Sequence, residues 1–196
     1  MSRLEEFVSL LTGRFNNDAQ YQEKQKEGLS FPYAEHVNTV CNQKINGLPA
    51  DFAGVFMVEE SYYTTASAQS GAERKFHTSA SHHLFLFTEE PEGIRLTSYE
   101  APEGYGKDDF TYANLREVDY ASLKPSAKFT PALYTEKDGV WEGGSVSQFT
   151  PALKFTLWER FSSEGLEVSE SMEMNGRPTF GYGEPILYKR AADPAQ

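Results

Sequence analysis

The chain has 196 residues, a length that suits one domain. Lys and Arg together number 18 and Asp and Glu number 29, so the formal net charge is −11. This charge argues against a general nucleic-acid-binding protein and a polybasic membrane-surface module, because both need a basic face. Aromatic residues make up 14% of the chain and can fill a sizeable core, which argues against disorder.

The number of cysteines and the first residues of the chain indicate the cellular compartment of the protein. The single cysteine, Cys41, excludes an internal disulfide and a zinc site built from several cysteines. The short apolar stretch at the start carries Glu5 and Glu6, whereas a signal peptide has an uninterrupted apolar region. No apolar run approaches the roughly 18–20 residues of a membrane span. These features predict a cytoplasmic, reduced protein with no membrane partner.

Residues 1–28 are expected to be a helical opening. Ser2 followed by Glu5 is a capping-box pattern. Four apolar residues follow at helical spacing: Leu4, Phe7, Val8 and Leu11. Gly13 stands where a C-terminal cap belongs, and the polar segment 16–28 predicts a second, solvated helix.

The pattern changes to strands after Pro32. Segments rich in aromatic and β-branched residues predict strands at 33–41, 53–65, 74–88 and 94–100. Residues 102–126 interrupt this pattern and predict a short helix that carries Leu115, Val118 and Leu123. Further strands are expected at 129–136, 140–145, 153–162, 166–174, 177–182 and 185–189. Asp138-Gly139 and Asn175-Gly176 are tight-turn signals between neighbouring strands.

The sequence thus predicts about nine or ten short strands after one helical opening, and this pattern indicates the fold class. Because no alternating helices follow the strands, the pattern argues against a parallel βαβ sheet. We predict a mostly β protein with a closed or nearly closed antiparallel β-barrel, since closure protects strand edges. The single domain is expected to span 1–190, with the barrel at 33–189 and a frayed tail at 191–196. A barrel of this size can enclose a small-molecule cavity.

A five-residue segment, Phe-Thr-Pro-Ala-Leu, occurs twice, at 129–133 and at 149–153. A repeat architecture needs at least three units. The duplication is therefore interpreted as coincidence or local duplication.

Standard catalytic signatures are absent from the sequence. The histidines are His36, His77, His82 and His83. His77 and His83 share one strand face but lie about 20 Å apart, so ordinary strand histidines are favoured and no metal site is predicted. The Gly-x-Gly within 176–183 has no helix after it and is interpreted as a strand turn rather than a phosphate site.

The pair Glu59-Glu60 is the strongest candidate for chemistry. It lies within a predicted strand, so one of the two must point into the barrel unless a bulge intervenes. A carboxylate inside a barrel is costly unless it is paired or touches a ligand. Tyr62 and Tyr63 continue the strand, and Arg74 is a candidate counter-charge. Two solvated carboxylates near a strand end are an equally weighted alternative.

Several segments match one known family in order along the chain. Residues 10–20 fit a G-x-F-x-N-x-x-Q pattern at Gly13, Phe15, Asn17 and Gln20. Residues 54–62 form an aromatic strand with Glu59 and a tyrosine three residues on, and later matches lie at 94–99, 139–143 and 180–188. In these segments the chain resembles the CpcT/CpeT family of phycobiliprotein chromophore lyases. It lacks the cysteines and the Asp-Arg-Gly segment that typical members carry in the second half.

The resemblance implies a calycin-like, lipocalin-like antiparallel barrel that holds a linear tetrapyrrole (bilin) as substrate, with no tightly bound cofactor. Such lyases attach the bilin by a thioether to a cysteine of a phycobiliprotein subunit. Homodimers are also plausible for the family.

The same resemblance suggests roles for four residues. Glu59 would pair with pyrrole N–H groups or donate a proton, and Arg74 would bind a propionate. Tyr62 and Tyr99 would stack on or hydrogen-bond the bilin. Glu59 and Tyr62 have opposite strand parity, and we favour Glu59 inside the barrel.

Two other functions stay open at this point. One is a non-catalytic barrel of the same fold that binds a tetrapyrrole or another small apolar ligand. The other is a structural or interaction protein with a filled barrel.

Overall fold

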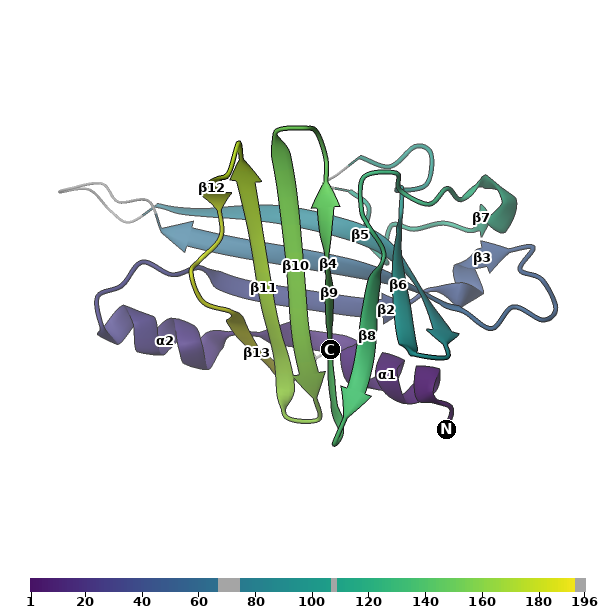
Figure 1. Ribbon diagram of the computed structural model, residues 1–196, viewed down its shortest axis with the longest axis horizontal. Coiled ribbons are helices and arrows are strands. Elements are labelled where there is room, and N and C mark those ends of the chain that lie inside the picture. Colours follow the sequence, from purple (N-terminus) through teal and green to yellow (C-terminus); the bar gives the residue numbers. More distant parts are fainter. Residues whose placement is uncertain (67–74, 107–108, 193–196) are drawn as a thin grey trace.

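Strands dominate the computed structural model, which describes residues 1–66, 75–106 and 109–192. Within these residues, ten antiparallel strands close into a barrel (Figure 1). The first strands around the barrel are β10 (Leu153–Ser162), β9 (Val140–Gln148), β8 (Ala132–Lys137), β6 (Gly93–Tyr99) and β5 (Phe76–Glu90). They continue with β4 (Val55–Ala66), β2 (Tyr33–Val40), β1 (Gly13–Asn16), β13 (Ile186–Arg190) and β11 (Gly165–Met174). Pairing of β11 with β10 closes the ring.

Three shorter strands lie outside this ring. Strand β12 (Arg177–Phe180) pairs with β11, and β3 (Ile45–Asn46) pairs in parallel with β7 (Val118–Asp119). The predicted antiparallel barrel is thus confirmed.

Two predicted hairpin turns have the backbone that their residues favour. Asp138 and Gly139 have φ values of 54° and 78°, and Asn175 and Gly176 have values of 51° and 75°. These left-handed conformations suit Asp, Asn and Gly, and they match the twist of the flanking strands.

The helical opening contains a strand that the sequence pattern did not predict. Helix α1 (Arg3–Leu11) begins with the predicted capping box, and α2 (Asp18–Lys26) follows. Between them, β1 (Gly13–Asn16) fills the gap between β2 and β13. Four residues are too few to show a period of two, so pairing with distant strands decides this conformation.

The predicted helix around Leu115, Val118 and Leu123 is also wrong. Val118 belongs to β7, and the only helical turn described here is the short 3₁₀ segment Tyr120–Ser122. Another 3₁₀ turn, Asn42–Lys44, precedes β3. Leu115 is buried against the outer face of β4 and β5, so its apolar character reflects packing rather than a helix.

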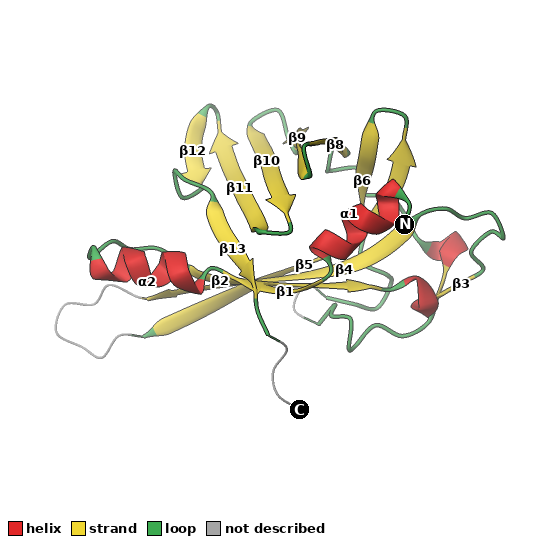
Figure 2. Ribbon diagram, turned by 90° about the horizontal axis from the view of Figure 1, so that it is seen from below, coloured by secondary structure: helices red, strands yellow, loops and turns green. Residues whose placement is uncertain are grey.

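Helix α1 closes one end of the barrel. Figure 2 shows α1 lying between the strands of the two sides of the barrel. The fully buried ring of Phe7 contacts Phe87, Tyr134, Trp141 and Phe161 with centroid distances from 5.0 to 5.3 Å. This aromatic core fills the interior beside α1, so any interior space lies toward the other end.

Candidate functional site

A pocket of about 50 Å³ lies inside the barrel. One part of its wall is apolar and consists of Phe85, Leu96, Phe129, Phe155, Leu157 and Val168. The other part is polar and consists of His36, Glu59, His83, Ser98, Thr130, Ser145, Glu159 and Glu170. This volume holds a few water molecules, whereas typical ligand pockets have roughly 300–1,000 Å³. No lysine or arginine of the described chain lines it.

Glu59 points into this pocket from β4. The inward positions of that strand alternate through Met57, Glu59 and Ser61. Ser61 Oγ donates a hydrogen bond to Glu59 Oε1 at 3.0 Å. Across the sheet, Asn38 on β2 and His83 on β5 are in register with Glu59, so polar residues flank it on both sides.

Two further carboxyl groups reach the same pocket from the opposite side of the barrel. Glu159 lies on β10 and is buried, and Glu170 lies on β11. The Tyr134 hydroxyl donates to Glu159, and the Tyr63 hydroxyl donates to Glu170 at 3.1 Å. Each of these carboxyl groups therefore has one hydroxyl donor, as Glu59 has Ser61.

Sequence reasoning did not single out Glu159 and Glu170, although a signal was present. Glu159 occupies the same strand face as Phe155, Leu157 and Phe161, and Glu170 follows Leu166 and Val168 at a period of two. A charged residue at an otherwise apolar inward position would have indicated an interior carboxyl group.

Burial dominates the electrostatics of this cluster. The pKa of Glu59 is raised to about 8, chiefly by desolvation and also by the nearby Glu159 and Glu170, against a smaller lowering by the Ser61 hydrogen bond. Desolvation also raises the pKa of Glu159 to about 7 and raises the pKa of Glu170. The cluster therefore retains protons near neutral pH, and its groups can both donate and accept hydrogen bonds.

His36 adds an unsatisfied polar group to the pocket. Only 3% of its surface is exposed, and neither ring nitrogen has a hydrogen-bond partner among the described residues. Desolvation lowers its pKa to about 3, so the imidazole is neutral. A neutral imidazole offers one donor and one acceptor, and leaving both unpaired in a buried position is costly. A bound molecule or water in the pocket would remove that cost.

Of the other predicted site residues, Tyr62 and Tyr99 do not join Glu59. Tyr62 lies on the outer face of β4, where its hydroxyl donates to Glu60 at 2.7 Å. Tyr99 packs against Phe56 at a centroid distance of 5.2 Å in the cluster outside the barrel. Strand alternation thus separates both tyrosines from the pocket. Arg74 lies outside the described residues.

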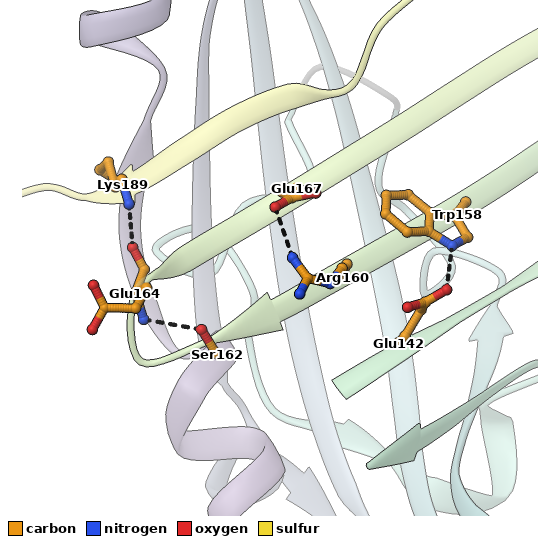
Figure 3. A network of polar contacts seen from close by, with 7 residues as sticks. All are labelled: Glu142, Trp158, Arg160, Ser162, Glu164, Glu167 and Lys189. Carbon is orange, nitrogen blue, oxygen red and sulfur yellow. Dashed lines mark hydrogen bonds and ion pairs between the residues drawn. The ribbon is translucent and has the colours of Figure 1, made fainter. Parts of the chain in front are cut away.

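Charged groups on the outer face contrast with the interior carboxyl groups. Figure 3 shows outward side chains of β9, β10 and β11 pairing with one another. Trp158 Nε1 donates to Glu142 at 3.2 Å, and Arg160 donates to Glu167 at 3.1 Å. The Glu142 and Glu167 carboxylates on the outer face have N–H donors, whereas the three interior carboxyl groups have only hydroxyl donors among the described side chains.

Neither a metal-binding group nor a membrane-spanning helix is found among the described residues. Within the described ranges, no three His, Cys, Asp or Glu side chains are grouped so that they could hold a metal ion. None of the described helices is long and apolar enough to cross a membrane. Comparison of the chain with protein-family models, curated proteins and solved structures found no match.

Proposed function

We propose that this barrel binds a linear tetrapyrrole through its interior carboxyl groups and acts as a chromophore lyase, as its resemblance to the CpcT/CpeT family implies. The observation that carries the proposal is the meeting of Glu59, Glu159 and Glu170 in one pocket that no described lysine or arginine lines. Buried carboxyl groups without cationic partners are costly, and N–H donors of a ligand would offset that cost. The pyrrole N–H groups of a bilin are donors of this kind.

The protonation state of Glu59 suits the proposed reaction. Thioether formation adds the S–H of an acceptor cysteine across a carbon–carbon double bond of the bilin. A sulfur–carbon bond forms, the neighbouring carbon gains a proton, and no group leaves. With a pKa of about 8, Glu59 is protonated at neutral pH and can donate this proton, and the thiol proton can then replace it.

The nucleophile in this proposal belongs to a phycobiliprotein subunit in the cytoplasm. Cys41 of this chain is buried, and desolvation raises its pKa to about 12. Because the thiolate is the reactive form of cysteine, Cys41 does not compete as an acceptor.

A second candidate function is non-catalytic binding of a smaller apolar ligand. The volume of about 50 Å³ favours it, because a tetrapyrrole needs a larger space than the pocket offers. Tetrapyrrole binding therefore requires the pocket to open.

The test is an absorbance titration of the protein with biliverdin, a linear tetrapyrrole, followed by addition of a phycobiliprotein apo-subunit. We expect a spectral shift on binding and a covalent adduct that survives denaturation. Glu59→Gln should weaken binding roughly 10-fold, because a hydrogen bond to an ionisable group is lost or weakened. Glu60→Gln, on the opposite face of the same strand, is the matched control and should bind normally.

The outcomes separate the two functions. Binding of biliverdin without transfer to the subunit would contradict the lyase reaction and leave a tetrapyrrole-binding protein without catalysis. No spectral change with biliverdin would contradict tetrapyrrole binding altogether.

A further inference from the structure

The duplicated Phe-Thr-Pro-Ala-Leu segment has a structural counterpart at one end of the barrel. One copy leads into β8 and the other into β10, and these strands lie on either side of β9. The first residues of the two copies meet there, with the rings of Phe129 and Phe149 5.1 Å apart at 85°. Figure 1 shows the connection between β9 and β10 at the end of the barrel away from α1. We call this end the mouth.

A third phenylalanine completes an aromatic cluster at the mouth. Phe155 lies 5.9 Å from Phe129 and 5.7 Å from Phe149, with the Phe149 ring nearly parallel to it at 18°. Phe129 and Phe155 line the carboxyl pocket, whereas Phe149 is not part of its wall. Phe129 and Phe149 are both half-buried, so the cluster stands between the pocket and solvent.

The backbone on both sides of this cluster is held by hydrogen bonds. The Thr130 N–H donates to the side chain of the buried Ser147 at 2.9 Å. The Phe149 N–H donates to the Leu153 carbonyl at 2.9 Å. Rotation of a phenylalanine side chain changes the mouth without breaking these bonds, and such rotations are faster than movements of a whole loop.

Of the three rings, Phe129 is the one that both lines the pocket and is half-buried rather than buried. It contacts Phe149, Phe155 and the His83 ring edge to face, at 5.1, 5.9 and 5.9 Å. Behind it, the rings of His83 and Phe85 are parallel within 6° at a centroid distance of 5.4 Å. Outward rotation of Phe129 would leave Phe155 and Phe85 as aromatic walls around the space that its ring now fills.

We propose that the Phe129 ring is the movable cover of the carboxyl pocket, and that the space it vacates is a subsite for a flat, conjugated, uncharged part of a ligand. This inference rests on the binding function proposed above and deepens it. Aromatic walls favour a flat ring system, because offset and edge-to-face contacts between rings are favourable. The absence of lysine and arginine from the described pocket wall disfavours an anionic group at this subsite.

The test uses N-phenyl-1-naphthylamine, a flat and uncharged fluorescent molecule, in stopped-flow binding. Phe129→Ala should raise its association rate at least about 10-fold, which corresponds to removing roughly 1.4 kcal/mol of barrier. Phe155→Leu keeps an apolar side chain but removes a ring wall, and it should weaken equilibrium binding about 5-fold. The matched control is Phe76→Ala, which removes a ring that is 61% exposed on β5.

The outcomes are distinct. Equal association rates for the wild type and Phe129→Ala would contradict the proposal that the Phe129 ring covers the pocket. An absence of fluorescence change with either protein would also contradict it. If Phe155→Leu is folded by circular dichroism and binds N-phenyl-1-naphthylamine with unchanged affinity, the proposed aromatic subsite is contradicted. If N-phenyl-1-naphthylamine binds as expected while biliverdin fails to bind, the Phe129 cover and its subsite are supported and the tetrapyrrole proposal is contradicted.

Discussion

Replacing Glu59 with glutamine should stabilise the protein at about pH 8 and leave its stability at about pH 5 nearly unchanged. In the unfolded chain the Glu59 carboxyl has its ordinary pKa of 4.5, and in the folded protein burial raises that pKa to about 8. Between these values the folded protein keeps a proton that the unfolded chain has lost. The free energy of unfolding therefore falls as the pH rises through this window.

The size of this effect follows from the shift. A change from 4.5 to about 8 corresponds to an upper limit of roughly 4–5 kcal/mol at 1.36 kcal/mol for each pKa unit. We expect about 2 kcal/mol at pH 8, because water that enters the pocket solvates part of the charge. Glutamine cannot ionise, and its side-chain oxygen can still accept the hydrogen bond from Ser61.

Urea unfolding at the two pH values measures the effect, with Glu60→Gln as the control. The Glu60 carboxylate accepts hydrogen bonds from the Tyr62 hydroxyl at 2.7 Å and the Tyr112 N–H at 3.0 Å. Its replacement should cost about 1 kcal/mol at both pH values. The reasoning would be refuted if Glu59→Gln destabilised the protein equally at both, or if Glu59 made no contribution to the pH dependence.

Three further substitutions test the packing, each by equilibrium urea unfolding. Phe7→Ala should cost about 3–5 kcal/mol, since its ring is the centre of the core beside α1, and a cost below 1 kcal/mol would contradict that role. Tyr134→Phe should cost about 1–2 kcal/mol because Glu159 loses its hydroxyl donor; no loss would mean that this bond is unimportant. Gly93→Ala should cost more than about 3 kcal/mol, because a Cβ would lie 2.0 Å from the Tyr134 carbonyl oxygen. Gly28→Ala is its control and should cost about 1 kcal/mol, because its φ is +72° but the space around it is open.

The barrel could be predicted because its signals are local. The strand expected at 153–162 has the same bounds as β10, since apolar residues alternate along it and a turn follows. Asp138-Gly139 marks its hairpin through backbone conformations that few other residues adopt. Strand β1 was missed because its conformation depends on pairing with β2 and β13 rather than on its own four residues.

The candidate site was predicted only in part, for a different reason. The apolar pattern around Glu59 made an inward carboxyl group a reasonable expectation. Glu159 and Glu170 join it only because β10 and β11 close the barrel opposite β4, and no sequence period describes that closure. The ligand-binding roles of Tyr62 and Tyr99 came from a resemblance to motifs, which carries no information about the face of a sheet. Strand parity had already placed Tyr62 on the face opposite Glu59, and the structure agrees.

A crystal structure of the protein with bound biliverdin would test tetrapyrrole binding by the interior carboxyl groups most directly. We predict that the bilin lies inside the barrel, with its pyrrole nitrogens within hydrogen-bond distance of Glu59 and the Phe129 ring rotated outward. A bilin bound on the outer face beside Tyr62 or Tyr99, with the interior pocket unchanged, would contradict the proposal.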